Sequence, residues 1–424
     1  MAIVTRRGAQ VDAQRVAVIP LDFVDAARDG APIGQKARNG ETMTMTITAA
    51  LTNAIAANAI PGVVAMVGDR DGVRERFAAG HRGDGSAMSL DTVFQLASMT
   101  KAVVSVAAMQ LVEAGKLSLD APIGDLLPDL AAPQVIAGFA EDGSAVLRAA
   151  KRPITLRHLL THTSGLGYDF VQAEVARARG PAGPPEPGSW ASIRSPLLFD
   201  PGDGWAYGVS TDWVGLAVEA ASGQRLDAYI ADHVTGPLGM TETGFVPEDA
   251  SAGRRAINMG RGEGGALAPF PINIGGGTSG AFISGGGGLW GTAADYMRFL
   301  RMLANGGALD GVRILAAESV AEMGRNQIGT LRAGRMTTTM PALSLAVDWF
   351  PDMTPGWGLG FLINPETGPA GRPAGSLAWA GICNTFFWIE PVAGTCAVLM
   401  MQVLPFADPG ALAVLEAFER AIYA

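Results

Sequence analysis

The sequence predicts an α+β fold, in which an antiparallel sheet built from both chain ends and flanked by helices carries a mostly helical inserted domain. Strand patterns gather near the two ends, over residues 61–82 and 356–402, whereas helix patterns fill most of the chain from about 120 to 330. Strands from both ends can bury their apolar faces by joining one sheet. Of the 424 residues 48% are hydrophobic, which is enough for a large core.

The elements of the N-terminal part follow in order. Residues 1–44 are polar and weakly patterned, and we interpret them as an N-terminal extension. Helical spacing over 47–60 predicts a helix. Two apolar runs within 61–82 are separated by an Asp-Gly dipeptide, which predicts a β-hairpin because this dipeptide favours a tight turn. Helical periodicity over 98–117 predicts the next helix.

The middle and the C-terminal part differ in character. The clearest helix patterns of the middle lie over 154–166, 211–223 and 292–307. Residues 273–291 are too rich in glycine for regular structure, and we expect their backbone to pack closely against other groups. Residues 356–402 hold successive short apolar runs that are typical of strands, and 411–424 predict a final helix.

These patterns divide the chain into three parts. Residues 1–44 form the N-terminal extension, 45–97 and 331–424 together form the sheet domain, and 98–330 form the mostly helical domain. We expect the functional site in the cleft between the second and third parts. The sequence carries no sign of the oligomeric state.

Composition excludes several classes of protein. The net charge is −9 and no basic run stands out, which argues against a nucleic-acid partner. No apolar run approaches the roughly 18 residues that span a bilayer, so no membrane span is expected. The first residues lack a secretory signal, which indicates a cytoplasmic protein, or a periplasmic one if a signal has been removed.

The two cysteines, Cys383 and Cys396, are too few for a disulfide framework. They fall on consecutive predicted strands, where a hairpin places Cys396 opposite a residue near Glu390 and not opposite Cys383. We therefore expect two buried, reduced thiols. No cluster of cysteine and histidine has metal-ligand spacing, so neither a metal nor a cofactor is implied.

The residue types point first to chemistry at Ser98 and Lys101. If a helix begins here, the two side chains share one face and the lysine nitrogen can reach the serine oxygen. The positive helix end favours a serine alkoxide and disfavours a charged lysine, which suits the lysine as a base. The alternative is a serine N-cap followed by a solvated lysine. Lys101 is, however, the only one of four lysines with serine three positions before it.

Two further features are candidates for the same site. Tyr207 lies between a Pro-Gly turn and a predicted helix, and a tyrosine held beside a lysine can relay a proton. Trp379, Ala380 and Gly381 lie on a predicted strand whose small residues let a substrate approach the backbone. Taken alone, Tyr207 fits a half-buried aromatic equally well, and the strand fits an ordinary core strand.

Other hydrolase chemistries fit less well. A Ser-His-Asp hydrolase of the nucleophile-elbow type needs G-x-S-x-G, and the sequence has none. His158 and His162 are one helical turn apart, a spacing that metal ligands use, but the pattern lacks the glutamate of a zincin. No metal site is therefore expected.

Six motifs, taken together and in order, resemble those of one family. They are S-x-x-K at 98–101, LRHLLTHTSGL at 156–166, F-x-PG with a following tyrosine at 199–207, GGGGLWGTAADYMRFL at 285–300, GWGLGF at 356–361 and WAG at 379–381. Over roughly residues 45–424 the chain is similar to the class C β-lactamase-like serine hydrolases. This group includes class C β-lactamases, DD-peptidases and, nearest to this chain, family VIII carboxylesterases. The resemblance implies the β-lactamase/penicillin-binding-protein fold.

The resemblance also implies a role for each matching residue. Ser98 would be the acylated nucleophile and Lys101 its general base. Tyr207 matches the tyrosine of the family's Y-x-N motif, which assists proton transfer to the leaving group. The backbone N–H groups of Ser98 and Ile382 would form the oxyanion hole. The two histidines fall in a segment that is structural in the family.

The substrate-binding positions depart from the family's pattern. Val209 stands where Y-x-N has an asparagine that holds the substrate amide in β-lactamases and peptidases. Trp379 and Ala380, which precede Gly381, replace the lysine and threonine of K-T-G, and no cation is left there for a substrate carboxylate. Family VIII esterases show such replacements, often with tryptophan. We therefore expect a carboxylesterase acting on a small-molecule ester that is uncharged or apolar.

Two alternatives remain open at this point. The same acyl-enzyme could serve a β-lactamase, DD-peptidase, amidase or acyltransferase, depending on what attacks it. The chain could also be a non-catalytic binding module on this fold. The presence of Ser98, Lys101 and Tyr207 together argues against a silent module, because such modules commonly lose one of the three.

Overall fold

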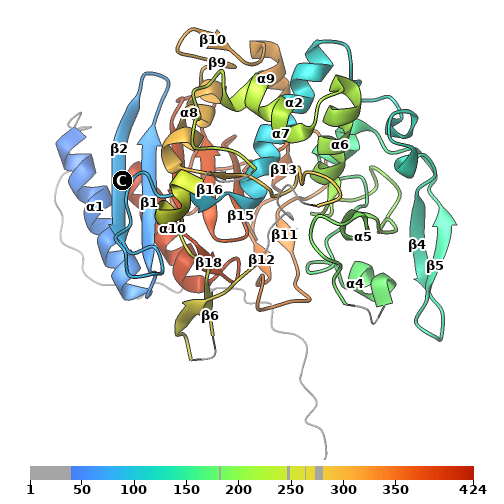
Figure 1. Ribbon diagram of the computed structural model, residues 1–424, viewed down its shortest axis with the longest axis horizontal. Coiled ribbons are helices and arrows are strands. Elements are labelled where there is room, and N and C mark those ends of the chain that lie inside the picture. The colour runs from blue at the N-terminus through green and yellow to red at the C-terminus, as the bar shows by residue number, and fades with distance from the viewer. Residues whose placement is uncertain (1–39, 181–182, 246–248, 263, 273–279) are drawn as a thin grey trace, which may run out of the picture. The chain divides into compact units, whose positions relative to one another are not determined.

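A seven-stranded antiparallel sheet lies at the centre of the structure (Figure 1). The computed structural model describes residues 40–180, 183–245, 249–262, 264–272 and 280–424, so most of the expected extension lies outside the described residues. Along the sheet the strands are β13 (Gly356–Trp357), β14 (Leu362–Ile363), β15 (Leu377–Gly381), β16 (Thr385–Ile389), β17 (Cys396–Met400), β1 (Gly62–Gly68) and β2 (Val73–Gly80).

The two ends of the chain meet inside this sheet. Strand β1 pairs antiparallel with β17, with Val64 opposite Met400, and with β2 on its other side. Every residue of β1 is buried, as its continuous apolar sequence predicts for a central strand, whereas β2 exposes part of its length at the edge. This arrangement confirms the predicted α+β fold with a sheet built from both ends.

Helices cover both faces of the sheet because successive side chains of a strand point to opposite sides. On β16, the ring of Phe387 contacts Tyr296 of α8 (Ala293–Ala304), and the ring of the next residue, Trp388, contacts Phe418 of α10 (Pro409–Tyr423). Helix α1 (Gly40–Ala57) packs beside α10 and β2. The core of the sheet domain lies between these layers.

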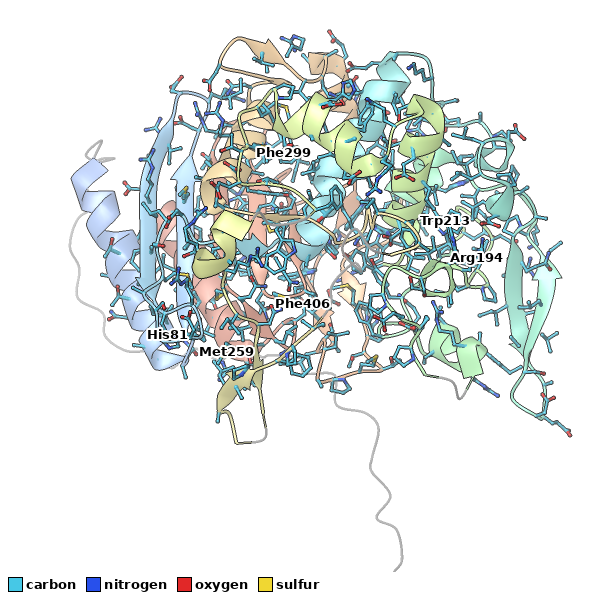
Figure 2. The ribbon with its side chains drawn as sticks, viewed as in Figure 1. His81, Arg194, Trp213, Met259, Phe299 and Phe406 are labelled. Atoms are coloured by element: carbon cyan, nitrogen blue, oxygen red, sulfur yellow. The ribbon has the colours of Figure 1, made fainter. Side chains whose placement is uncertain are left out.

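Local sequence sets where these helices begin. Thr292 caps α8 by accepting a hydrogen bond from the N–H of Asp295, and Asp408 caps α10 in the same way through the N–H of Ala411. Phe299 projects from α8 and Trp213 from α6 (Ser210–Ser222) into the interior (Figure 2). No helix of the described residues is long and apolar enough to cross a membrane.

The remaining helices form the part of the chain between the first hairpin and the C-terminal strands. They are the 3₁₀ turn η1 (Ala97–Met99), α2 (Thr100–Glu113), the 3₁₀ turns η2 (Ile123–Asp125) and η3 (Pro128–Leu130), α3 (Leu156–Leu160), α4 (Ala173–Arg179), α5 (Trp190–Ile193), α7 (Leu226–Ile230), the π-turn η5 (Ala231–Thr235), the 3₁₀ turn η6 (Asp249–Arg254) and α9 (Ala317–Met323). Nearly all of α2 is buried, as expected of a helix that is apolar on every side.

Small strands complete the described structure. They pair as β3 (Phe94–Gln95) with β8 (Trp290–Gly291), β4 (Gln134–Phe139) with β5 (Ala145–Ala149), β6 (Met259–Arg261) with β7 (Leu267–Pro269) and β18 (Val403–Leu404), β9 (Ala308–Leu309) with β10 (Val312–Arg313), and β11 (Arg335–Met336) with β12 (Val347–Asp348). The β4–β5 hairpin was not predicted. Its side chains are mostly half-buried or exposed, so it lacks the alternation that marks a strand in sequence.

One predicted helix is much shorter than its pattern. The expected helix over 154–166 ends at Leu160, and His162 takes a left-handed backbone conformation with φ of 56°. Residues from 161 onwards therefore leave the helix and run as a buried loop toward the centre of the molecule. The described residues from 40 onwards belong to one compact unit, and the division into a sheet domain and a helical domain stays a prediction.

Candidate active site

Ser98 lies at the junction between the turn η1 and helix α2. Ala97, just before it, adopts φ of 46°, a left-handed conformation that is strained for a residue with a Cβ. The turn is held in place by hydrogen bonds, because the N–H of Leu96 donates to the carbonyl of Leu289, and the hydroxyl of Tyr296 donates to the carbonyl of Met99. Ser98 itself is half-buried, so its hydroxyl is fixed in place and still accessible.

Lys101 lies three residues after Ser98, in the first turn of α2, and its amine points at the serine hydroxyl. Its Nζ is 3.1 Å from Ser98 Oγ, 3.1 Å from the hydroxyl of Tyr168 and 2.6 Å from the carbonyl oxygen of Gly286. These three acceptors match the three donors of an ammonium group. The lysine is 1% exposed and makes no ion pair within the described part of the chain. The predicted pair of serine and lysine is therefore brought together inside the protein.

A buried carboxylate supports this lysine through Gly286. Asp212 Oδ1, on α6, accepts hydrogen bonds from Ser284 Oγ at 2.6 Å and from the N–H of Gly286 at 3.0 Å. A Cβ on Gly286 would lie 2.6 Å from Asp212 Oδ2, so only glycine fits. This close approach agrees with the expectation for the glycine-rich stretch over its described residues from 280 onwards. Burial raises the pKa of Asp212, and the Lys101 ammonium opposes that rise.

The ring of Tyr207 packs against the lysine amine. The Nζ of Lys101 is 4.9 Å from the centre of its ring, and its hydroxyl accepts a hydrogen bond of 3.1 Å from Trp379 Nε1. The next position, Gly208, has room only for glycine, because a Cβ there would lie 2.1 Å from the carbonyl oxygen of Leu166. Trp379 and Tyr207 are thus joined although they are 172 residues apart in the sequence.

Tyr168, like Asp212, is a site residue that the sequence motifs did not predict. Its hydroxyl, and not that of Tyr207, is the one hydrogen-bonded to Lys101. Burial raises its pKa well above the usual value, and Asp212 and Tyr207 add to the rise, so Tyr168 is a neutral phenol at ordinary pH. It lies two residues beyond the motif at 156–166, in a loop whose glycines and polar residues show no period. Its place beside a buried lysine depends on tertiary structure alone.

The predicted oxyanion-hole and substrate positions lie near this centre. Strand β15 packs against η1, and a Cβ on Gly381 would come within 2.5 Å of the carbonyl oxygen of Leu96. Ile382 follows directly after this contact. Trp379 and Ala380 are buried in the strand, and Val209 is buried at the start of α6. The Trp379 indole packs on the rings of Tyr207 and Trp357, with centroid distances of 4.8 Å and 4.6 Å.

The two histidines have structural contacts. His158 Nδ1 accepts from the N–H of Thr155 and closes the capping box of α3. His162 is buried against the rings of Tyr207 and Trp357, at 4.9 Å and 5.2 Å. Burial, with a smaller contribution from the nearby lysine, lowers the pKa of His162 well below its usual value. The ring is therefore neutral, and it packs against Tyr207 and Trp357.

The cysteines make hydrogen bonds to residues outside this group, Cys383 Sγ to Asn258 Oδ1 and Cys396 Sγ to Met297 Sδ. Both are free and buried, and Cys396 pairs with Ile389 in the register of β16 and β17, next to the predicted partner. Burial raises the pKa of each thiol to about 12. The prediction of two buried, reduced thiols is confirmed.

Known proteins are similar to this chain in sequence and in fold. A sequence profile of the Beta-lactamase family matches residues 47–420. Lovastatin esterase of Penicillium rubens is 33% identical over 80% of this chain and 87% of its own length. Monacolin J acid methylbutanoyltransferase of Aspergillus terreus is 33% identical over 80% of this chain and 83% of its own. The unliganded structure of simvastatin synthase (LovD) from Aspergillus terreus superposes with a TM-score of 0.75, at 30% identity over 92% of this chain and 99% of that one.

Proposed function

The chain belongs to the beta-lactamase family, as an enzyme of its hydrolase and acyltransferase branch, and we propose that it cleaves carboxylic esters through an acyl-enzyme on Ser98. The observation that carries the proposal is the distance of 3.1 Å between Lys101 Nζ and Ser98 Oγ in a site that buries the lysine. A lysine removed from water is a usable base, and a serine beside it is a usable nucleophile.

In the proposed acylation step, the neutral amine of Lys101 takes the proton of Ser98 while Oγ attacks the ester carbonyl carbon. The backbone N–H groups of Ser98 and Ile382 stabilise the negative charge that develops on the carbonyl oxygen. The tetrahedral intermediate collapses as its bond to the alcohol oxygen breaks. Tyr207 donates its proton to that oxygen and recovers one from the lysine ammonium. In the second step Lys101 takes a proton from the water that attacks the acyl carbon. The bond between that carbon and Ser98 Oγ then breaks, Oγ takes the proton back from the lysine, and the acid leaves.

The substrate-side residues support an ester over a β-lactam. Trp379 and Val209 offer neither the cation nor the amide that would recognise the carboxylate and amide of a β-lactam, so such substrates lose their main contacts. The Trp379 indole has a second use here, because its N–H binds the Tyr207 hydroxyl. Tryptophan at this position thus both removes the carboxylate subsite and orients the proposed proton donor.

Acyl transfer is the second candidate, because one relative is a methylbutanoyltransferase of the same identity as the esterase relative. Both activities use the same acyl-enzyme and differ in whether water or an alcohol attacks it. Product analysis in the presence of an added alcohol separates them, since a transferase yields mainly the new ester and an esterase mainly the free acid.

The proposal is tested by comparing p-nitrophenyl butyrate with a chromogenic cephalosporin, each with wild-type protein and Ser98→Ala. We expect ester turnover that depends on Ser98 and little cephalosporin turnover. Dominant cephalosporin turnover would contradict the assignment of an esterase. Ester turnover that survives the substitution would contradict the assignment of Ser98.

The two tyrosines are expected to differ in their dependence on the leaving group. Tyr207→Phe removes the proposed proton donor and should lower kcat for ethyl butyrate by about 100-fold or more. It should affect p-nitrophenyl butyrate far less, because p-nitrophenolate leaves without a proton. Tyr168→Phe removes a partner of Lys101 and should slow both esters equally. Steady-state kinetics on both esters check this, and an equal loss for both esters in Tyr207→Phe would rule out its role as proton donor.

Asp212 is expected to make the effect of its own substitution depend on pH. Asp212→Asn keeps the oxygen that accepts from Ser284 and Gly286 but removes the negative charge next to the Lys101 site. Burial raises the pKa of Asp212, and below that pKa the wild-type carboxyl is itself protonated and neutral. The kcat/KM values of wild type and Asp212→Asn should therefore differ at neutral pH and converge as the pH falls through the pKa of Asp212. Equal kcat/KM values at every pH would show that the carboxylate acts only through its hydrogen bonds.

A further inference from the structure

A cavity of about 710 Å³ lies behind the loop that carries Tyr207. Its lining includes Trp205 and Ala206, the two residues before Tyr207, and Gln172, whose Nε2 donates to the Tyr207 carbonyl oxygen at 3.1 Å. Strands β4 and β11 and helix α4 contribute other walls. The volume is in the range of sites that bind small molecules. The cavity is therefore next to the backbone that positions Tyr207.

One part of the cavity is aromatic. Phe139 of β4, Phe199 and Trp205 line it, and Trp205 stacks on Tyr207 with a centroid distance of 6.4 Å. Trp205 Nε1 is buried and has no hydrogen-bond partner among the described residues. A buried N–H without a partner is costly, and a polar atom of a bound molecule would satisfy it. This wall suits an apolar ligand with a hydrogen-bond acceptor.

The other part is rich in arginine. Arg332 is fixed by Asp348 Oδ1 at 2.6 Å and by the carbonyl oxygen of Phe350 at 2.7 Å. Arg335, opposite Asp348 across β11 and β12, is exposed and forms no ion pair with any residue of the described ranges. Asp348 thus pairs with Arg332 and leaves Arg335 without an ion pair in the described ranges.

The other charged groups near the cavity do not cancel this excess. Glu174 of α4 lines the cavity, and the Arg177 guanidinium lies 4.0 Å from the centre of the Phe139 ring. The charged residues that line the cavity are Arg332, Arg335 and Glu174. Asp348 offsets Arg332, and Arg335, which has no ion pair in the described ranges, suits an anionic ligand group.

We infer that this cavity receives the alcohol part of the ester and that Arg335 binds a carboxylate carried by that part. The inference rests on the proposed function, in which Tyr207 protonates the departing alcohol. The reacting end of the substrate is uncharged, in agreement with Trp379, while the far end carries the anion. A guanidinium binds a carboxylate through paired N–H groups, which gives the cavity its selectivity.

The test uses two esters with the same acyl group, the butanoate of p-hydroxyphenylpropanoic acid and the butanoate of its amide, which differ only in the charge at the far end. Wild type should show the higher kcat/KM for the carboxylate ester. Arg335→Gln should reduce this preference by about tenfold. The matched control is Arg76→Gln, which removes the same charge from an exposed position of β2, far from β4 in Figure 1, and should leave the preference unchanged.

Binding measured without turnover keeps this inference separate from the proposed function. Calorimetric titration of Ser98→Ala with p-hydroxyphenylpropanoate and its amide should show tighter binding of the carboxylate, and the added Arg335→Gln change should remove the difference. Equal binding of the two compounds, or an equal effect of Arg76→Gln, would overturn the inference. If the titration succeeds while neither ester is hydrolysed through Ser98, the proposed function fails and the anion site stands.

Discussion

Replacing Ser98 by alanine is expected to lower kcat for p-nitrophenyl butyrate by about 10⁴- to 10⁶-fold, because the bond to the acyl group forms at this oxygen. The lost hydroxyl accepts one of the three hydrogen bonds of Lys101, so the fold should stay intact. Steady-state kinetics, with thermal unfolding of both proteins as a check on the fold, measure this effect.

A matched control for this variant is available in the helix that follows Ser98. Ser105 lies on α2, is buried, and donates to the carbonyl oxygen of Lys101 at 2.8 Å. Ser105→Ala removes a neighbouring buried hydroxyl without touching the proposed nucleophile, so its kcat should remain within about tenfold of wild type. Comparable losses for the two alanine variants would show that the effect comes from disturbing α2 and not from losing the nucleophile.

Replacing Lys101 by methionine is expected to lower kcat by about 10³- to 10⁴-fold, because no other base is hydrogen-bonded to Ser98 in the described residues. Methionine has a similar length and no charge, so it fills the space of the buried side chain. The carbonyl of Gly286 and the hydroxyl of Tyr168 each lose a donor, which costs some stability. Kinetics and thermal unfolding, measured together, separate the two effects.

Arginine at the same position distinguishes a base from a positive charge. Lys101→Arg keeps the cation near Ser98, but arginine holds its proton at any ordinary pH and cannot accept another from the serine. We expect Lys101→Arg to be as inactive as Lys101→Met. A substantial recovery of kcat with arginine would mean that Lys101 acts by its charge, and the role of general base would have to be abandoned.

Much of the fold could be predicted from sequence periods. Continuous apolar runs identified β1 and the C-terminal strands, and the Asp-Gly dipeptide placed the first turn. The β4–β5 hairpin could not be predicted in this way because its apolar side chains do not alternate between a buried and an exposed face. Val146 and Leu147, for example, are adjacent and both exposed. The end of α3 at Leu160 could not be predicted either, because the helical spacing of the leucines continues beyond it. His162 lies outside the helix, where its ring packs against Tyr207 and Trp357.

Some residues of the candidate site could likewise be predicted from sequence, and others could not. Ser98 and Lys101 could be paired from sequence because three residues on a helix fix their separation. Tyr168 and Asp212 could not, because each reaches the lysine region through the packing of a distant loop or helix. The bond between Trp379 and Tyr207 was equally hidden, and it gives the tryptophan a positioning function that its place in the motif did not suggest.

The most direct test of the central claim is to locate the covalent bond. A p-nitrophenyl alkylphosphonate reacts with a serine nucleophile and, unlike an ester, leaves an adduct that water does not remove. Intact-protein and peptide mass spectrometry should find one adduct per chain, on Ser98, and none in Ser98→Ala. An adduct on another residue, or equal labelling of Ser98→Ala, would contradict the account of Ser98 as the nucleophile.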